Sequence, residues 1–225
     1  MRTTWRWPRD HDEGDLIVSE MDEVIPALVA AVQEQHATGD HYRDDAIRQA
    51  MEHQAQLALR PGPVRVDVIV DPPWSDGQIN SVQVVTGDRP FLVDTVVSCL
   101  LRHGWRVEDV RHPIIGVKRD RGTIEAVGTP GRGGCASESW IHIDVTAPLG
   151  TDIGQAAEQL RDDLCACLDQ VVCATDDWGA MHEAMLRTAE LVSASSGPAD
   201  DRDSSRELLE WLADDHFMYL SLIHI

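Results

Sequence analysis

Valine occupies every second position between Val64 and Val70, which is the period of a half-buried β-strand. Further short segments rich in β-branched residues predict strands at 80–86, 105–110, 114–119, 123–127 and 140–145. Asp120-Arg121-Gly122 predicts a hairpin turn between two of them. These strands follow one another closely, which favours an antiparallel sheet in the middle of the chain.

Apolar residues at intervals of three and four predict helices around and within this strand-rich region. Before the strands, one apolar stripe follows Pro26, a residue that fits the first turn of a helix, and a second stripe lies at 46–59. Between the strands, residues 90–103 predict a helix that ends at Gly104. After the strands, helices are predicted over 153–171 and 178–192.

The order of the elements from residue 80 onward is strand, helix, three strands, helix to within one strand, which predicts an α+β fold, a ferredoxin-like antiparallel sheet with helices packed on one face. Two helices precede it. We expect an irregular arm at 1–15, a helical segment at 16–62, the α+β domain at 63–192, a Ser-, Asp- and Gly-rich linker at 193–205, and the start of a second domain at 206–219. The apolar residues of that last segment need a partner that the short remainder does not supply, so we expect the chain to stop inside the second domain.

The junction between the second strand and the following helix is the strongest candidate for a binding site. Gly87 can adopt a positive φ, Asp88 can accept hydrogen bonds from the first helical amides, and Pro90 fits the first helical position. Exposed amides at a helix start attract carboxylates and phosphates. The candidate amino-acid or anion site therefore comprises Thr86, Gly87, Asp88, Arg89 and Pro90. A turn that binds nothing is the alternative, because every such connection needs a helix start signal.

Composition narrows the classes of partner and the compartment. The 225 residues carry a formal charge of −20, which opposes binding to nucleic acid or anionic lipid. No apolar run reaches the roughly 20 residues of a membrane span, and residues 1–15 are too charged for a secretory signal. The 5 cysteines form no Cys-x-x-Cys pair, which suits reduced thiols that serve as packing residues. We expect a cytoplasmic protein.

Three other residue groups suggest chemistry only weakly. Residues 131–136 spell a dinucleotide-binding G-x-G-x-x-A, but a predicted strand follows where that motif needs a helix. His112, His142 and Asp144 could be drawn as a metal cluster, although core or solvated roles suit strand residues better. Cys135 and His142 lack a third catalytic group. We therefore expect no metal site, no cofactor site and no catalytic residue in this segment.

Three segments in order carry a family resemblance: 85–94 (Val-Thr-Gly-Asp-Arg-Pro-Phe-Leu-Val-Asp), 138–144 (Glu-Ser-Trp-Ile-His-Ile-Asp) and 207–217 (Glu-Leu-Leu-Glu-Trp-Leu-Ala-Asp-Asp-His-Phe). Together they resemble the N-terminal region of the large bacterial NAD-specific glutamate dehydrogenases. In that family this region is similar to ACT domains, which often bind amino acids. Residues 220–225 depart from the family and look like a translated sequencing adapter, so we expect an artefactual tail.

The resemblance implies a non-catalytic portion, regulatory or assembly-forming, of an enzyme that oxidatively deaminates L-glutamate to 2-oxoglutarate and ammonia with NAD bound outside this segment. Glutamate dehydrogenation uses paired cations, usually lysines, and Lys118 is the single lysine of the chain. We expect as partners the remainder of its own polypeptide, further copies in a homo-oligomer, and a small amino-acid effector. The alternative is a free-standing ACT-like protein that senses amino acids.

Overall fold

The computed structural model describes residues 21–35, 44–75, 77 and 79–216. The predicted arm at 1–15 and the predicted tail at 220–225 lie outside the described residues. Contacts divide the chain into two compact units, with a boundary between Asp169 and Gln170.

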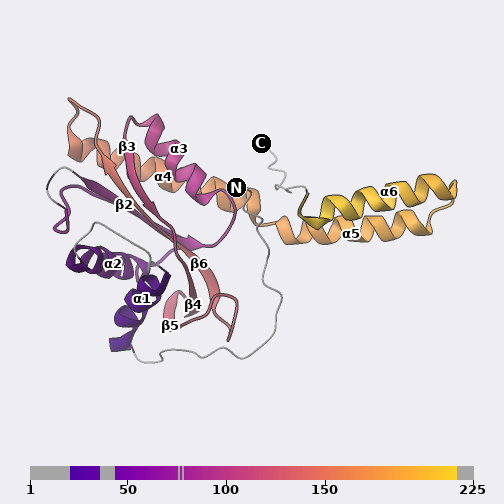
Figure 1. Ribbon diagram of the computed structural model, residues 1–225, viewed down its shortest axis with the longest axis horizontal. Coiled ribbons are helices and arrows are strands. Elements are labelled where there is room, and N and C mark those ends of the chain that lie inside the picture. The colour runs from indigo at the N-terminus through magenta and orange to yellow at the C-terminus, as the bar shows by residue number, and fades with distance from the viewer. Residues whose placement is uncertain (1–20, 36–43, 76, 78, 217–225) are drawn as a thin grey trace. The chain divides into compact units, whose positions relative to one another are not determined.

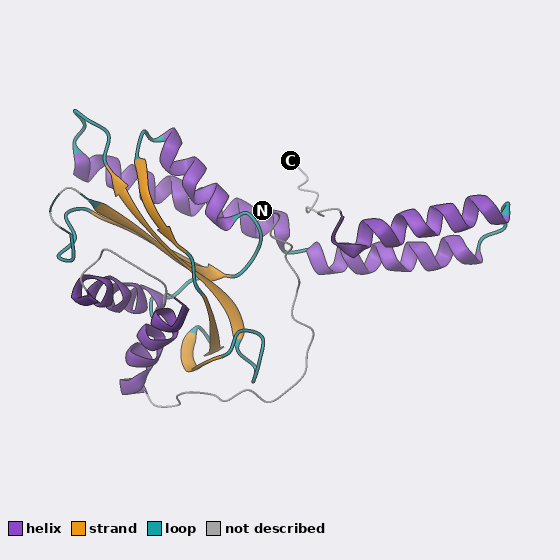
Figure 2. Cartoon of the chain, viewed as in Figure 1, coloured by secondary structure: helices purple, strands orange, loops and turns teal. Residues whose placement is uncertain are grey.

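An antiparallel sheet lies at the centre of the larger unit (Figures 1 and 2). Its strands are β1 (Val64–Ile69), β2 (Asn80–Gly87), β3 (Arg106–Arg111), β4 (Ile114–Asp120), β5 (Thr123–Gly128) and β6 (Ala136–Thr146). The order is β1-β2-β6-β4-β5, and β3 also pairs with β6. The predicted strands are therefore confirmed, and β6 begins earlier than the periodicity suggested.

The long strand β6 organises the topology. Its first residues pair with β4 and its last residues with β3, on the side opposite β2. Because β2 and β3 are both antiparallel to β6, they are parallel to each other, and helix α3 (Leu92–Arg102) joins them. A helix crossing between two parallel strands that flank an antiparallel one is the split βαβ unit of ferredoxin-like folds. This arrangement confirms the α+β, ACT-like fold class.

One face of the sheet packs against the first two helices, α1 (Met21–Gln35) and α2 (Asp44–Ala58). Trp140 of β6 and Val85 of β2 lie opposite each other and share a buried cluster with the apolar residues of both helices. The Gln54 side chain of α2 reaches into the sheet and donates to the carbonyls of Val84 (3.3 Å) and Ile141 (2.9 Å). The two helices that precede the predicted domain are thus part of its core.

The other face of the sheet is aliphatic. It carries five fully buried residues of β2 and β6, which we call the aliphatic face: Val82, Val84, Ile141, Ile143 and Val145. Helices α3 and α4 (Ile153–Thr175) lie together on this side (Figure 1). The sequence predicted helices on one face of the sheet. These two helices supply that layer, while α1 and α2 cover the opposite face.

Helix α1 differs from its prediction at Pro26. The helix already begins at Met21, so Pro26 lies inside it instead of in its first turn. A proline there removes one backbone donor, but the apolar stripe around it is buried, with Leu28 0% exposed. Burial of the stripe outweighs the local penalty of the proline.

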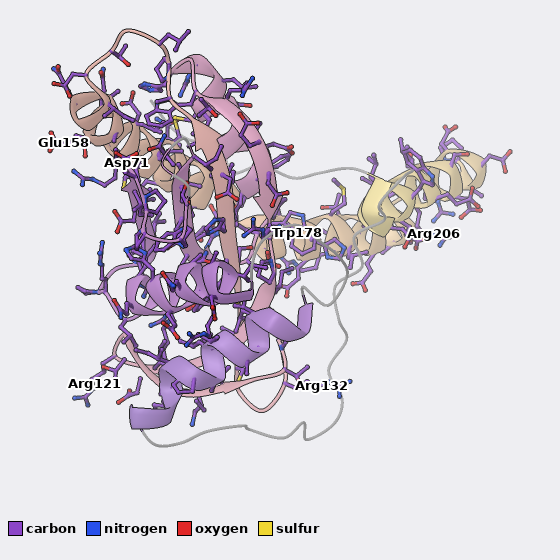
Figure 3. The ribbon with its side chains drawn as sticks, turned by 60° about the vertical axis from the view of Figure 1, so that its left-hand side comes forward. Asp71, Arg121, Arg132, Glu158, Trp178 and Arg206 are labelled. Atoms are coloured by element: carbon purple, nitrogen blue, oxygen red, sulfur yellow. The ribbon has the colours of Figure 1, made fainter. Side chains whose placement is uncertain are left out.

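The smaller unit is a helical hairpin. Helices α5 (Trp178–Ala194) and α6 (Ala199–Trp211) contact each other along their length, and a short π-helical turn (Leu212–His216) follows α6. Figure 3 labels Trp178 at the start of α5 and Arg206 in α6. Residues 199–205, which composition predicted as linker, are helical because Pro198 precedes α6 and Asp200 and Asp201 favour its positive end. The contacts also place α5 outside the ACT-like unit.

Candidate functional site

The junction between β2 and α3 is built differently from its prediction. Helix α3 begins at Leu92, and Phe91 is its N-cap, with φ 71° and ψ 2°. The positive φ expected at Gly87 therefore occurs at Phe91, and Gly87 is an ordinary last residue of β2. Pro90 lies before the cap, not at the first helical position. A bulky residue with positive φ is uncommon in folded proteins.

Asp88 does not cap the helix, so that prediction is wrong. Its amide donates to the Ser137 carbonyl (2.8 Å), which prolongs the β2–β6 pairing by one residue. Its carboxylate accepts a hydrogen bond from Ser139 Oγ (2.5 Å) across the sheet. The strand thus holds Asp88 three residues before the cap, and within the described residues the N-cap Phe91 makes no side-chain hydrogen bond to α3. The first amides of α3 keep the capacity to bind an anion.

Two hydrogen bonds connect Asp88 to His112 through Ser139. Ser139 is fully buried, and its Oγ lies 2.9 Å from His112 Nε2. Since the hydroxyl has one proton and directs it to Asp88, His112 Nε2 must carry a proton and donate to Ser139. Burial lowers the pKa of His112, while the Asp88 carboxylate acts in the opposite direction. This order of groups differs from a hydrolase triad, in which the histidine accepts the serine proton.

Thr86 lies directly opposite Ser139 on the same face of the sheet. It is 1% exposed, and among the described residues its Oγ1 has no hydrogen-bond partner. A buried hydroxyl without a partner costs roughly 1–3 kcal/mol. It therefore marks a position where a ligand or water would gain a hydrogen bond.

The remaining predicted site residues, Gly87, Arg89 and Pro90, are partly exposed at the junction. Arg89 folds back so that its Nε donates to the Gly87 carbonyl (3.4 Å). A Cβ at Gly87 would meet only Arg89 Nη2 at 3.6 Å, so the glycine is not required by space. The structure brings Thr86 and Asp88 together around Ser139. It adds Ser139 and His112, whose proximity to Asp88 depends on how β6 pairs with its neighbours, and Phe91, whose positive φ the sequence pattern did not predict.

The hypothetical metal cluster of His112, His142 and Asp144 is not assembled. His112 contacts Ser139, whereas His142 and Asp144 belong to the opposite face of β6. Within the described ranges, no three His, Cys, Asp or Glu side chains are grouped to hold a metal ion.

The glycine-rich residues 131–134 form a turn with positive φ at three glycines and lead directly into β6, as the strand periodicity predicted.

A second buried polar cluster lies on the face covered by α2, and we call it the polar face cluster. It comprises Ser81, Gln83, His142 and Asp144. Gln83 Nε2 donates to the Ala50 carbonyl (2.8 Å) and lies 3.0 Å from His142 Nδ1. Asp144 accepts from Ser81 (3.2 Å) and His142 (3.1 Å). Its other oxygen accepts from Arg111 Nη2 at 2.8 Å.

This cluster binds α2 to the sheet and leaves little room for a ligand. Gln83 Nε2 has two protons, which it gives to Ala50 and to His142 Nδ1, so His142 Nε2 donates to Asp144. Every polar group of the cluster therefore has a partner.

A hollow of about 380 Å³ lies elsewhere, between α1 and α2, lined by Ile25, Pro26, Val29, Ala30, Arg48, Glu52 and Gln56.

Comparison with known proteins agrees with this architecture. The profile of the family described as glutamate dehydrogenase, ACT1 domain, matches residues 28–164, which is more than half of the chain. The chain belongs to this family. The matched residues run from α1 to α4, so the ACT1 region includes the first two helices as well as the sheet.

Two curated relatives are both named NAD-specific glutamate dehydrogenase. The one from Halomonas elongata is 30% identical over 146 residues, and the one from Pseudomonas aeruginosa is 25% identical over 145 residues. Each alignment covers 62% of this chain and 9% of the relative. The chain thus spans a small part of the length of these relatives. Among the described residues, no helix has the length and apolar character needed to cross a membrane.

Proposed function

We propose that this ACT1 region is a non-catalytic regulatory part of an NAD-dependent glutamate dehydrogenase and binds a small amino acid at the β2–α3 junction. The whole enzyme would convert L-glutamate to 2-oxoglutarate and ammonia, with NAD bound outside this segment. The region would act with the remainder of its polypeptide in a homo-oligomer. The observation that carries the proposal is the buried Thr86 hydroxyl, which has no hydrogen-bond partner among the described residues and lies near the end of β2, the strand that leads into α3.

The junction offers the two kinds of group that an α-amino acid needs. The first amides of α3 suit the carboxylate of the ligand, because a helix N-terminus carries about half a positive charge. The Asp88 carboxylate suits the ammonium group, since an ionised carboxylate has several acceptor positions and Ser139 uses only one of its oxygens. The left-handed Phe91, which is 39% exposed, adds an apolar surface beside these groups. Strained residues of this kind cluster at binding sites.

The absence of catalytic chemistry in this segment is supported by the environment of its single lysine. Lys118 Nζ forms an ion pair with Glu125 Oε2 (3.1 Å) between β4 and β5, and the lysine side chain is 44% exposed. A lysine engaged at a strand pair cannot form the cation pair that glutamate oxidation uses. We therefore expect no NADH absorbance when this chain is incubated with L-glutamate and NAD, and measurable turnover would refute the division of labour.

Amino-acid binding is tested by thermal-shift titration of the full chain with L-glutamate, L-aspartate and other amino acids. A ligand at 100 times its Kd adds about 2.7 kcal/mol to the free energy of unfolding, which is easily detected. Thr86→Val and Asp88→Asn should weaken the shift, whereas Glu125→Gln, far along the sheet edge, should leave it unchanged. A shift unaffected by Thr86→Val and Asp88→Asn, or no shift with any amino acid, would rule out this site.

A further inference from the structure

Two cysteines that are far apart in the sequence lie on the α3–α4 side of the sheet. Cys99 lies near the end of α3 and is 1% exposed, and Cys167 lies in α4 and is half-buried. Cys99 lies one helical turn before His103 and Cys167 one turn after Asp163, and His103 Nε2 lies 2.8 Å from Asp163 Oδ2, so the two cysteines lie on facing sides of α3 and α4. The sequence analysis treated both as packing residues, because no Cys-x-x-Cys spacing connects them.

An arginine accompanies the pair. Arg102, at the end of α3 and one helical turn after Cys99, donates from Nη2 to the Sγ of Cys167 at 3.4 Å. Cysteines that react with oxidants lie in electropositive, partly exposed surroundings. Burial raises the pKa of the Cys99 thiol. The two thiols therefore differ, because Cys167 is accessible and next to a cation whereas Cys99 is enclosed.

We propose that Cys99 and Cys167 form a peroxide-sensitive thiol pair that closes to an intramolecular disulfide between α3 and α4. The Cys167 sulfur, as thiolate, attacks one oxygen of hydrogen peroxide and becomes a sulfenic acid. The other oxygen leaves as hydroxide, which takes up a proton. The Cys99 thiol then attacks the sulfenic sulfur, the S–S bond forms, and the second oxygen of the peroxide leaves as water. Two thiols and one peroxide thus give one disulfide and two waters.

One residue after Arg102, His103 Nε2 lies 2.8 Å from Asp163 Oδ2 of α4, so a second contact joins the same helix ends. A disulfide requires that the two Cα atoms come within about 7 Å of each other, which favours a pair on helices that are already joined. Because α3 starts at the β2–α3 junction, the disulfide would fix the helix that carries the candidate ligand site.

The experiment oxidises the full chain with hydrogen peroxide, blocks the remaining thiols with N-ethylmaleimide and identifies linked peptides by tandem mass spectrometry. We expect a Cys99–Cys167 link that disappears on reduction. Single variants assign the bond, because Cys165, Cys167 and Cys173 lie in one tryptic peptide. Cys167→Ser should abolish the link, while Cys165→Ser and Cys173→Ser should retain it. Cys99 linked to Cys165 or Cys173, or no link to Cys99, would overturn the proposal.

Two further measurements test the geometry. The oxidised chain should melt about 5 °C or more above the reduced chain, because the bond closes a long loop in the unfolded state. Arg102→Gln should slow disulfide formation several-fold, and the exposed Arg121→Gln serves as its control. An unchanged rate in Arg102→Gln would show that the arginine does not activate Cys167. An unchanged melting temperature after complete oxidation would contradict a bond between α3 and α4.

Discussion

The two faces of the central strands β2 and β6 bury different kinds of side chain. Toward α3 and α4, the aliphatic face is made of Val and Ile residues that are 0% exposed. Toward α1 and α2, the polar face cluster places amide, imidazole and carboxylate groups in an equally buried layer. The comparison shows that one face of a strand pair can be wholly aliphatic while the other combines a hydrogen-bond network with apolar residues such as Val85 and Trp140.

The difference has a physical consequence. Aliphatic burial is non-directional and contributes roughly 25 cal/mol for each Å² removed from water. A buried polar network contributes little net stability, but it penalises every arrangement in which one of its members loses a partner. We infer that the aliphatic face contributes non-directional stability, whereas the polar face cluster fixes the position of α2 on the sheet.

The largest expected effect is on the aliphatic face. Ile143→Ala should lower the free energy of unfolding by about 2–5 kcal/mol, because it leaves a cavity between β6 and the helix layer. Urea denaturation measures the change. Leu101→Ala is the matched control, since Leu101 is 61% exposed and its truncation should be nearly neutral. An Ile143→Ala loss as small as the control would contradict close packing of this face against the helices.

The next effect concerns the polar face cluster. Asp144→Ala should cost about 2–4 kcal/mol, because it leaves Arg111 and His142 without the carboxylate that both contact. Arg111 also pairs with Asp109, whose side chain is 48% exposed. Asp109→Ala removes the exposed carboxylate from the same arginine and should cost less than about 1 kcal/mol. Equal losses in the two variants would contradict the role assigned to burial.

A smaller effect is expected at the β2–α3 junction. Asp88→Ala should cost about 1 kcal/mol through loss of the hydrogen bond from Ser139. Loss of a helix cap would cost a similar amount, so the magnitude alone does not separate the two explanations. A double-mutant cycle with Ser139→Ala does separate them. The structure requires coupling between the two substitutions, whereas a cap would make their effects additive.

The smallest effect is a pH dependence at His112. Burial lowers the pKa of this histidine below the ordinary value of 6.5, so below about that pH the unfolded chain binds a proton that the folded chain excludes. Folding stability contributed by the neutral His112 is therefore present above pH 6.5 and is lost as the pH falls through the lowered pKa. His112→Gln should give a shallower decline of stability below pH 6.5 in urea titrations. A steeper decline in the variant would reverse the assigned sign.

Local patterns in the sequence were sufficient for the strands. The alternation at 64–70 and the β-branched runs correspond to β1–β6, because a half-buried strand needs a period of two whatever its neighbours are. The helix boundary at the junction was less predictable. Gly87, Asp88 and Pro90 have strong local preferences for a turn and a cap, yet pairing of Asp88 with Ser137 extends the strand and moves the cap to Phe91. Tertiary hydrogen bonds outweighed local propensity there.

The amino-acid sequence by itself determined the strand and helix periods, the fold class and the family, since these depend on local patterning and on motifs that are contiguous in the chain. Only the tertiary structure decided that His112 and His142 lie on opposite faces, that Ser139 joins Asp88 to His112, and that Cys99 and Cys167 lie on facing sides of α3 and α4. Each of these contacts depends on strand register or on the packing of helices distant in sequence. A shift of one residue in the pairing of β6 would exchange its two faces.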